Sequence, residues 1–126
     1  MAMSTDWRRL CRGPGLTVED DTVTVTFENQ RSHRVRIKET ETTFELHALV
    51  ARASNIAQPE SLPLRIWRHN RAAQLVGFRL DTRNSVRAEG WVAKAGLEAQ
   101  EFQHVLRRVA AESDRFEFIL TGKDTE

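Results

Sequence analysis

Apolar side chains at every second position mark two segments in the first half of the chain, residues 22–28 and residues 34–38. A period of two with many β-branched residues is typical of a half-buried strand. The polar residues 29–32 between the two segments are typical of a turn. The pattern therefore predicts an antiparallel hairpin with one face buried and the other face in water.

Residues 43–52 are open to two interpretations. Phe44, Leu46, Ala48 and Val50 alternate with more polar neighbours, which favours a strand, whereas the alanine content favours a helix. We take the strand, because it continues the meander of the first two.

The next apolar pattern, over residues 62–73, has a helical period, with Pro63 in the first turn, where proline is tolerated. A strand over residues 64–70 is the competing interpretation. In the helix, one side carries Leu62, Ile66, Trp67 and Asn70.

A second hairpin follows, with strands over residues 75–81 and 86–92 around the polar turn 82–85. The period then changes, and residues 97–112 predict a long amphipathic helix. The polar pair at 113–114 interrupts this helix.

Residues 115–121 fit either a restarted helix that ends at Gly122 or a short strand. At the other end, residues 5–11 predict a short helix, capped by Thr5 or Asp6. The sum is an α+β chain in the order α-β-β-β-α-β-β-α, with an antiparallel sheet of about five strands and helices mainly on one face. We expect residues 1–126 to form a single domain.

This element order and the second half of the chain resemble the YbjN-like proteins, which share the fold of the class I type III secretion chaperones. The residues that carry the resemblance are Trp67-Arg68-His69-Asn70-Arg71, Leu75-Val76-Gly77-Phe78-Arg79-Leu80-Asp81, Glu89-Gly90-Trp91-Val92, Gly96-Leu97, Glu101-Phe102, Ala110-Ala111-Glu112-Ser113-Asp114-Arg115-Phe116-Glu117 and Leu120-Thr121-Gly122-Lys123-Asp124. The resemblance implies a binding or chaperone-like protein that is often dimeric and uses no cofactor.

The composition narrows the functional classes. The 19 basic and 18 acidic residues nearly cancel, and only three of the basic residues are lysines. A single cysteine excludes an internal disulfide framework. No apolar stretch approaches the ~20 residues of a membrane helix, and the first ten residues lack the apolar region of a secretion signal. We therefore expect a cytoplasmic protein with no membrane partner.

Residues with potential chemistry are scattered along the sequence. His33, His47, His69, His104 and Cys11 show no metal-ligand spacing, and no phosphate loop, catalytic pair or triad is recognisable. We expect no metal, no cofactor and no enzymatic activity.

One segment, Arg65 to Arg71, places arginines beside a tryptophan, a combination enriched in protein interfaces. The simpler alternative is that Trp67 lies in the core with the arginines at its rim. Trp91 lies on the same, solvent-exposed side of its strand as Arg87 and Glu89, unless a bulge at Gly90 shifts the register and turns Trp91 into the core.

We expect a non-enzymatic protein-binding module, chaperone-like or regulatory, which self-associates as a homodimer. Its candidate partner-binding residues are Trp67, Arg68, Arg71 and Trp91. The alternative is a nucleic-acid or anionic-ligand binder that uses the arginines of the Arg65–Arg71 segment, but the balanced net charge lacks the basic footprint of such proteins.

Overall fold

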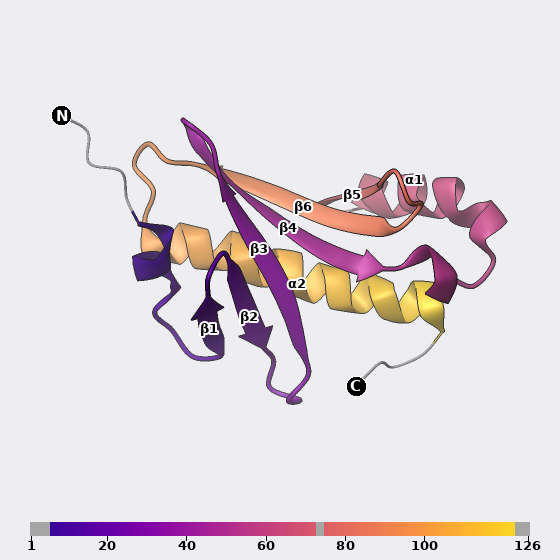
Figure 1. The fold of residues 1–126 in the computed structure, drawn as a ribbon, viewed down its shortest axis with the longest axis horizontal. Helices are drawn as coiled ribbons and strands as arrows, with labels where there is room; N and C mark the ends of the chain where they lie inside the picture. Colours follow the sequence, from indigo (N-terminus) through magenta and orange to yellow (C-terminus); the bar gives the residue numbers. More distant parts are fainter. Residues whose placement is uncertain (1–5, 73–74, 123–126) are drawn as a thin grey trace.

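A computed structural model describes residues 6–72 and 75–122. It has one layer of sheet and one layer of helices (Figure 1). The elements in chain order, with η for a 3₁₀ helix, are η1 (Trp7–Cys11), β1 (Leu16–Glu19), β2 (Thr22–Thr26), β3 (Ser32–Glu39), β4 (Thr43–Ala51), η2 (Ala53–Asn55), η3 (Pro59–Ser61), α1 (Leu62–Ala72), β5 (Gly77–Leu80), β6 (Val86–Ala93) and α2 (Ala99–Thr121).

The sheet has six strands in the order β1-β2-β3-β4-β6-β5, and every neighbouring pair is antiparallel. The predicted α+β class, antiparallel sheet and placement of helices on one face are confirmed. The expected number of about five strands missed β1, which has four residues. Its Leu16 and Val18 pack against the core.

Alternation along the strands produces the two faces of the sheet. The inward side chains of β2 and β3 are buried. Residues 43–52 were open to strand or helix, and the predicted strand is confirmed as β4. Phe27 lies just beyond β2, where its N–H bonds to the carbonyl of Arg31 in the turn. The helix predicted over residues 62–73 is also confirmed, as α1.

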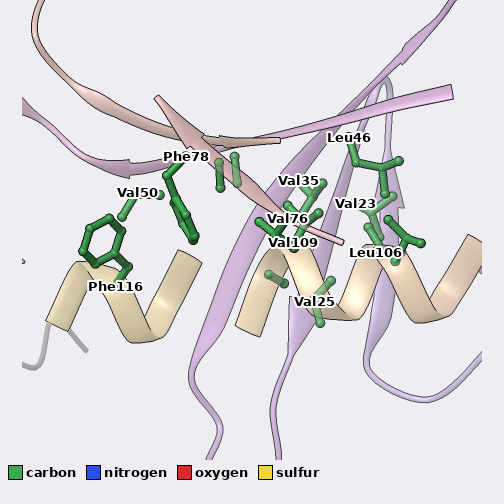
Figure 2. Close-up of a cluster of buried hydrophobic side chains, with 14 of the residues drawn as sticks. Val23, Val25, Val35, Leu46, Val50, Val76, Phe78, Leu106, Val109 and Phe116 are labelled. Carbon is green, nitrogen blue, oxygen red and sulfur yellow. The ribbon is translucent and has the colours of Figure 1, made fainter. Parts of the chain in front are cut away.

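The long helix α2 runs along the covered face of the sheet and contacts β3, β4 and β6 (Figure 1). Figure 2 shows side chains of α2 facing those of the strands. Each large apolar side chain buried in this layer contributes roughly 1.5–3 kcal/mol relative to exposure. The fully buried residues of α2 with large side chains are Phe102, Leu106, Val109, Phe116 and Leu120.

The predicted break at residues 113–114 is wrong, because α2 is continuous from Ala99 to Thr121. Ser113 is fully buried, and its Oγ donates to the carbonyl of Val109 at 2.6 Å, so the hydroxyl is satisfied inside the helix. Residues 115–121 are helical rather than a strand. The helix ends at Gly122, whose φ of 68° is left-handed, as expected of a C-terminal glycine cap.

The N-terminal segment packs on the first turns of α2. Asp6 caps η1 by accepting from the Arg8 N–H at 3.1 Å, and the Trp7 ring stacks on Phe102 at 6.5 Å between centroids. Burial, and secondarily the charge of Asp6, raises the pKa of the Cys11 thiol to about 11, so it is an unreactive core side chain. The alternative cap Thr5, the predicted helix end at Ala73, and Lys123-Asp124 of the resemblance lie outside the described residues.

No helix within residues 6–72 and 75–122 is both long enough and apolar enough to cross a membrane.

Candidate functional site

Helix α1 packs beside the second half of α2 through a histidine. The His69 ring stacks on Phe116, with 4.0 Å between centroids and 2° between planes, and meets the edge of Phe78 at 4.8 Å. Burial lowers the pKa of His69, the nearby Arg115 lowers it further, and Glu112 partly opposes the shift. The stack therefore favours the neutral imidazole.

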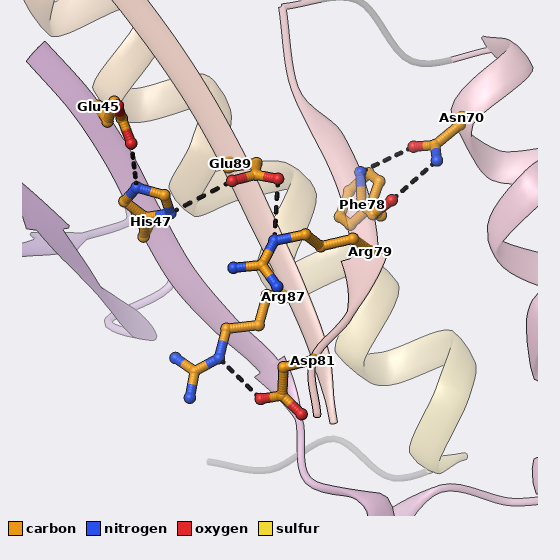
Figure 3. Close-up of polar contacts among 8 residues, drawn as sticks. All are labelled: Glu45, His47, Asn70, Phe78, Arg79, Asp81, Arg87 and Glu89. Carbon is orange, nitrogen blue, oxygen red and sulfur yellow. Dashed lines mark hydrogen bonds and ion pairs between the residues drawn. The ribbon is translucent and has the colours of Figure 1, made fainter. Parts of the chain in front are cut away.

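An asparagine of α1 covers the outer edge of the sheet. The Asn70 side-chain amide donates to the carbonyl of Phe78 at 2.9 Å, and its oxygen accepts from the Phe78 N–H at 2.8 Å (Figure 3). Phe78 is in the middle of β5, an edge strand, so these bonds occupy backbone groups that would otherwise face outward. Such groups are a template for pairing with another strand, and Asn70 blocks that pairing at this point.

Arg65 joins α1 to its neighbours. Its guanidinium donates to the carbonyl of Ala57 at 2.8 Å and to that of Ile119, near the end of α2, at 3.1 Å. This arginine is therefore committed to internal contacts and contributes little to a ligand site.

The outward side of α1 carries an apolar and cationic surface. Leu64 is 50% exposed and Trp67 is 56% exposed. The guanidinium of Arg71, one turn further on, lies 5.0 Å from the centre of the Trp67 ring, within cation–π range. Arg68 is also exposed. We call these four residues the α1 surface.

The placement of Trp67 on the same side as Leu62 and Ile66 is wrong, and so is the alternative that Trp67 belongs to the core. Leu62 and Ile66 are buried, whereas Trp67 projects into solvent. One step along a helix turns the side chain by about 100°, which is enough to carry Trp67 out of the buried side.

Trp91 lies on the opposite, uncovered face of the sheet and is 67% exposed. The β4–β6 register is regular through this part, with Glu45 opposite Trp91 and Leu46 opposite Gly90. There is thus no bulge at Gly90, and the alternation correctly predicted the solvent-exposed side for Trp91.

A shallow pocket of about 330 Å³ lies beside Trp91. Within it, His47 lies between two carboxylates, with Nε2 3.0 Å from Glu45 and Nδ1 3.4 Å from Glu89 (Figure 3). Arg79 donates to Glu89 at 3.0 Å. The arrangement offers an aromatic wall for an apolar group and a rim of polar groups for hydrogen bonds, as in many binding pockets.

The four predicted site residues thus fall into two groups. Trp67, Arg68 and Arg71 come together on α1, whereas Trp91 lies on the other face of the sheet. Sequence reasoning missed further exposed apolar side chains, which no motif or alternation distinguished from buried ones. They are Leu64 of α1, Leu75 just before β5, and Phe118 and Ile119 of α2.

No known family model matches the sequence, and no curated protein matches it.

Solved structures do match the chain, and complexes of chaperones are among them. The ExsC–ExsE complex aligns with a TM-score of 0.64 and 15% identity, covering 96% of this chain and 98% of the other. The ExoU–SpcU heterodimer of the Pseudomonas aeruginosa type III secretion system aligns with a TM-score of 0.57 and 14% identity, covering 83% and 87%. The HopA1–SchA chaperone–effector complex aligns with a TM-score of 0.51 and 16% identity, covering 93% and 88%. The chain therefore has a chaperone-like fold.

Proposed function

We propose that this chain is a non-enzymatic protein-binding module, chaperone-like or adaptor-like in action, formed by a single YbjN-like domain. It acts in the cytoplasm as a homodimer and needs no cofactor. The observation that carries the proposal is the α1 surface, where Trp67 and Leu64 are half-exposed beside arginines. Tryptophan and arginine dominate the binding energy of protein interfaces.

The α1 surface suits contact between two copies of the chain. A two-fold interface uses the same patch on both copies, and a short helix with an outward tryptophan can pack against its own copy. The competing route, strand pairing through β5, is disfavoured because Asn70 occupies the outward backbone groups of Phe78. Self-association through α1 follows from these two features together.

The open sheet face suits the partner protein. An extended segment laid across it can insert an apolar side chain beside Trp91 and hydrogen-bond to the carboxylates of Glu45 and Glu89. The fold supports this assignment, since ExsC and SchA have the same fold and were solved in complexes with ExsE and HopA1.

The two exposed tryptophans provide a matched pair of variants. We expect Trp67→Ala to weaken self-association by about 2 kcal/mol, roughly thirtyfold in dissociation constant, because it removes the central aromatic side chain. Trp91→Ala removes the other exposed indole, which lies on the opposite face of the sheet, and is expected to leave the dimer intact. Sedimentation equilibrium over a range of concentrations measures both. A wild-type monomer at all concentrations, or equal effects of the two variants, would contradict the dimer interface.

Partner binding is tested with the same variants as bait. We expect a tagged wild-type chain to retain one dominant protein from the host lysate at moderate salt, and Trp91→Ala to lose it. Mass spectrometry identifies the protein, and absorbance reports any nucleic acid in the eluate. Nucleic acid that is released by a modest rise in salt would instead support the arginine-based alternative, because phosphate contacts are strongly salt-dependent.

A further inference from the structure

A histidine and two carboxylates from distant parts of the sequence meet on the covered side of the sheet. His33 comes from the start of β3, and Asp114 and Glu117 come from α2. One potential ligand atom of each, a ring nitrogen and two carboxylate oxygens, lies within 4.8 Å of the other two. All three residues are half-buried. We call them the His33 cluster.

The elements explain why the three side chains converge. His33 has the same inward parity as Val35 and Ile37 on β3, so it points toward α2. Asp114 and Glu117 are three residues apart, and residues at this spacing are neighbours on one side of a helix. The cluster therefore bridges the sheet and the helix layer.

A hydrogen bond determines which nitrogen of His33 carries the proton. Its Nε2 lies 2.8 Å from the carbonyl oxygen of Leu49 on β4. A carbonyl oxygen only accepts, so Nε2 carries the proton and donates it, which leaves Nδ1 with a free lone pair. A ring N–H donated to a backbone carbonyl is the usual support of a metal-bound histidine.

Arg31 holds one of the carboxylates in position. Its Nη2 donates to Oδ1 of Asp114 at 3.0 Å, and both side chains are largely buried. Because a carboxylate has two oxygens with about four lone-pair sites, Asp114 can bind this guanidinium and a further cation together.

An open path leads to the cluster. A hollow of about 420 Å³ lies between the end of β4, η2 and the last turns of α2. Both Glu117 and Leu49, the hydrogen-bond partner of His33, line it. The hollow gives a hydrated ion access and leaves room for water ligands.

We propose that His33, Asp114 and Glu117 form a binding site for a divalent transition-metal ion of the Zn²⁺ type, with water in the remaining position. One imidazole and two carboxylates suit such an ion, whereas Mg²⁺ and Ca²⁺ take oxygen ligands alone. Bonds of roughly 2.0–2.2 Å would draw the three side chains closer together than they now lie. The bound ion links β3 to α2. This metal site is separate from the proposed protein-binding function.

Isothermal titration of the full chain with Zn²⁺, after removal of metals with a chelator, tests the site. We expect one ion per chain. His33→Gln and Glu117→Gln each remove one ligand and are expected to weaken binding by roughly 10–100-fold or more. His47→Gln is the control, since His47 also contacts two carboxylates but lies on the open face of the sheet. Circular dichroism checks that each variant is folded.

The outcomes separate clearly. Absence of Zn²⁺ binding by the wild-type chain would overturn the site, as would wild-type affinity in Glu117→Gln, a half-exposed position whose change should leave the fold intact. Loss of binding in His47→Gln, with His33→Gln unaffected, would place the ion on the open face instead. Equal affinity for Mg²⁺ would overturn the transition-metal assignment.

Discussion

Single side chains account for much of how this chain uses its polar residues. His69 stacks on Phe116 and meets the edge of Phe78, Asn70 replaces a missing strand partner, and Arg65 binds two backbone carbonyls. Each of these residues sits in the segment that the sequence marked as a binding surface. The structure divides that segment into residues that hold α1 in place and residues that are free to contact a partner.

The lowered pKa of His69 makes stability depend on pH. Above its ordinary value of 6.5 the imidazole is neutral in both states, and the stack contributes fully. As the pH falls, the unfolded chain binds the proton first, so the free energy of unfolding decreases. We expect less stability at about pH 5 than at about pH 7.5 by urea unfolding. His69→Phe keeps a stacked ring and should remove most of that difference.

The exposed His104 is the control for this experiment, because His104→Gln should retain the wild-type pH dependence. Asp21 and Asp81 also have lowered pKa values, the first from its bond to Arg36 and the second from the Ser85 N–H. Both titrate below 3.8 and do not affect this comparison. An unchanged pH dependence in His69→Phe would show that the stack is not the cause.

At the scale of the elements, the contact between α2 and β6 depends on a glycine. A Cβ at Gly90 would lie 3.0 Å from the backbone oxygen of Leu75 and 3.1–3.2 Å from side-chain carbons of Val109 and Val105. Gly90 therefore lets the helix approach the strand closely, in the middle of a strand where glycine is otherwise unfavourable.

Gly90→Ala and Gly77→Ala form a matched pair on adjacent strands. We expect Gly90→Ala to reduce the free energy of unfolding by about 1–3 kcal/mol through overpacking. A Cβ at Gly77 meets no atom within 4 Å, so Gly77→Ala should be neutral or slightly stabilising. Urea midpoints measure both, and similar losses in the two variants would argue against close packing at Gly90.

The elements also show where prediction from the sequence succeeds and fails. Strands with a period of two were found, and the side of Trp91 was correct, because adjacent strand residues always face opposite ways. The four-residue β1 was missed because so short an alternation resembles a loop. Trp67 was assigned to the buried side of α1 because a shift of a single helical position moves a side chain from the buried to the exposed side. A helix of eleven residues has too few apolar positions to fix the direction of its buried side accurately. Ser113 looked like a break because its bond to Val109 exists only within the helix.

The whole molecule offers a test of how firmly its N-terminal segment is attached. The single cysteine, Cys11, is the last residue of η1 and is buried. Gln103 of α2 donates to the carbonyls of Leu10 at 2.8 Å and Arg12 at 3.2 Å. We expect Gln103→Ala to speed labelling of Cys11 by a thiol reagent about fivefold, because about 1 kcal/mol of hydrogen bonding is lost.

The exposed neighbour His104 is the control, since His104→Ala should label at the wild-type rate. Gln103→Ala should also lower the free energy of unfolding by about 1 kcal/mol, which a small decrease of the urea midpoint reports. Equal labelling rates in the wild type and Gln103→Ala would show that other contacts hold the segment.

The His33 cluster could not be predicted from the sequence, because residues 33 and 114–117 meet only through the packing of α2 on the sheet.

The position of β6 between β4 and β5 has a consequence for how the chain folds. Strands β1 to β4 form one local meander and β5–β6 one local hairpin, so each half can assemble from nearby residues. The seam between them pairs Thr43 with Ala93, fifty residues apart, and such long-range closure is slow. Among the elements that the structure describes, α2 is the one that packs on β3, β4 and β6 together, and it follows both halves in the chain. We therefore expect the two halves to keep apolar faces uncovered until α2 has formed and packed on both of them.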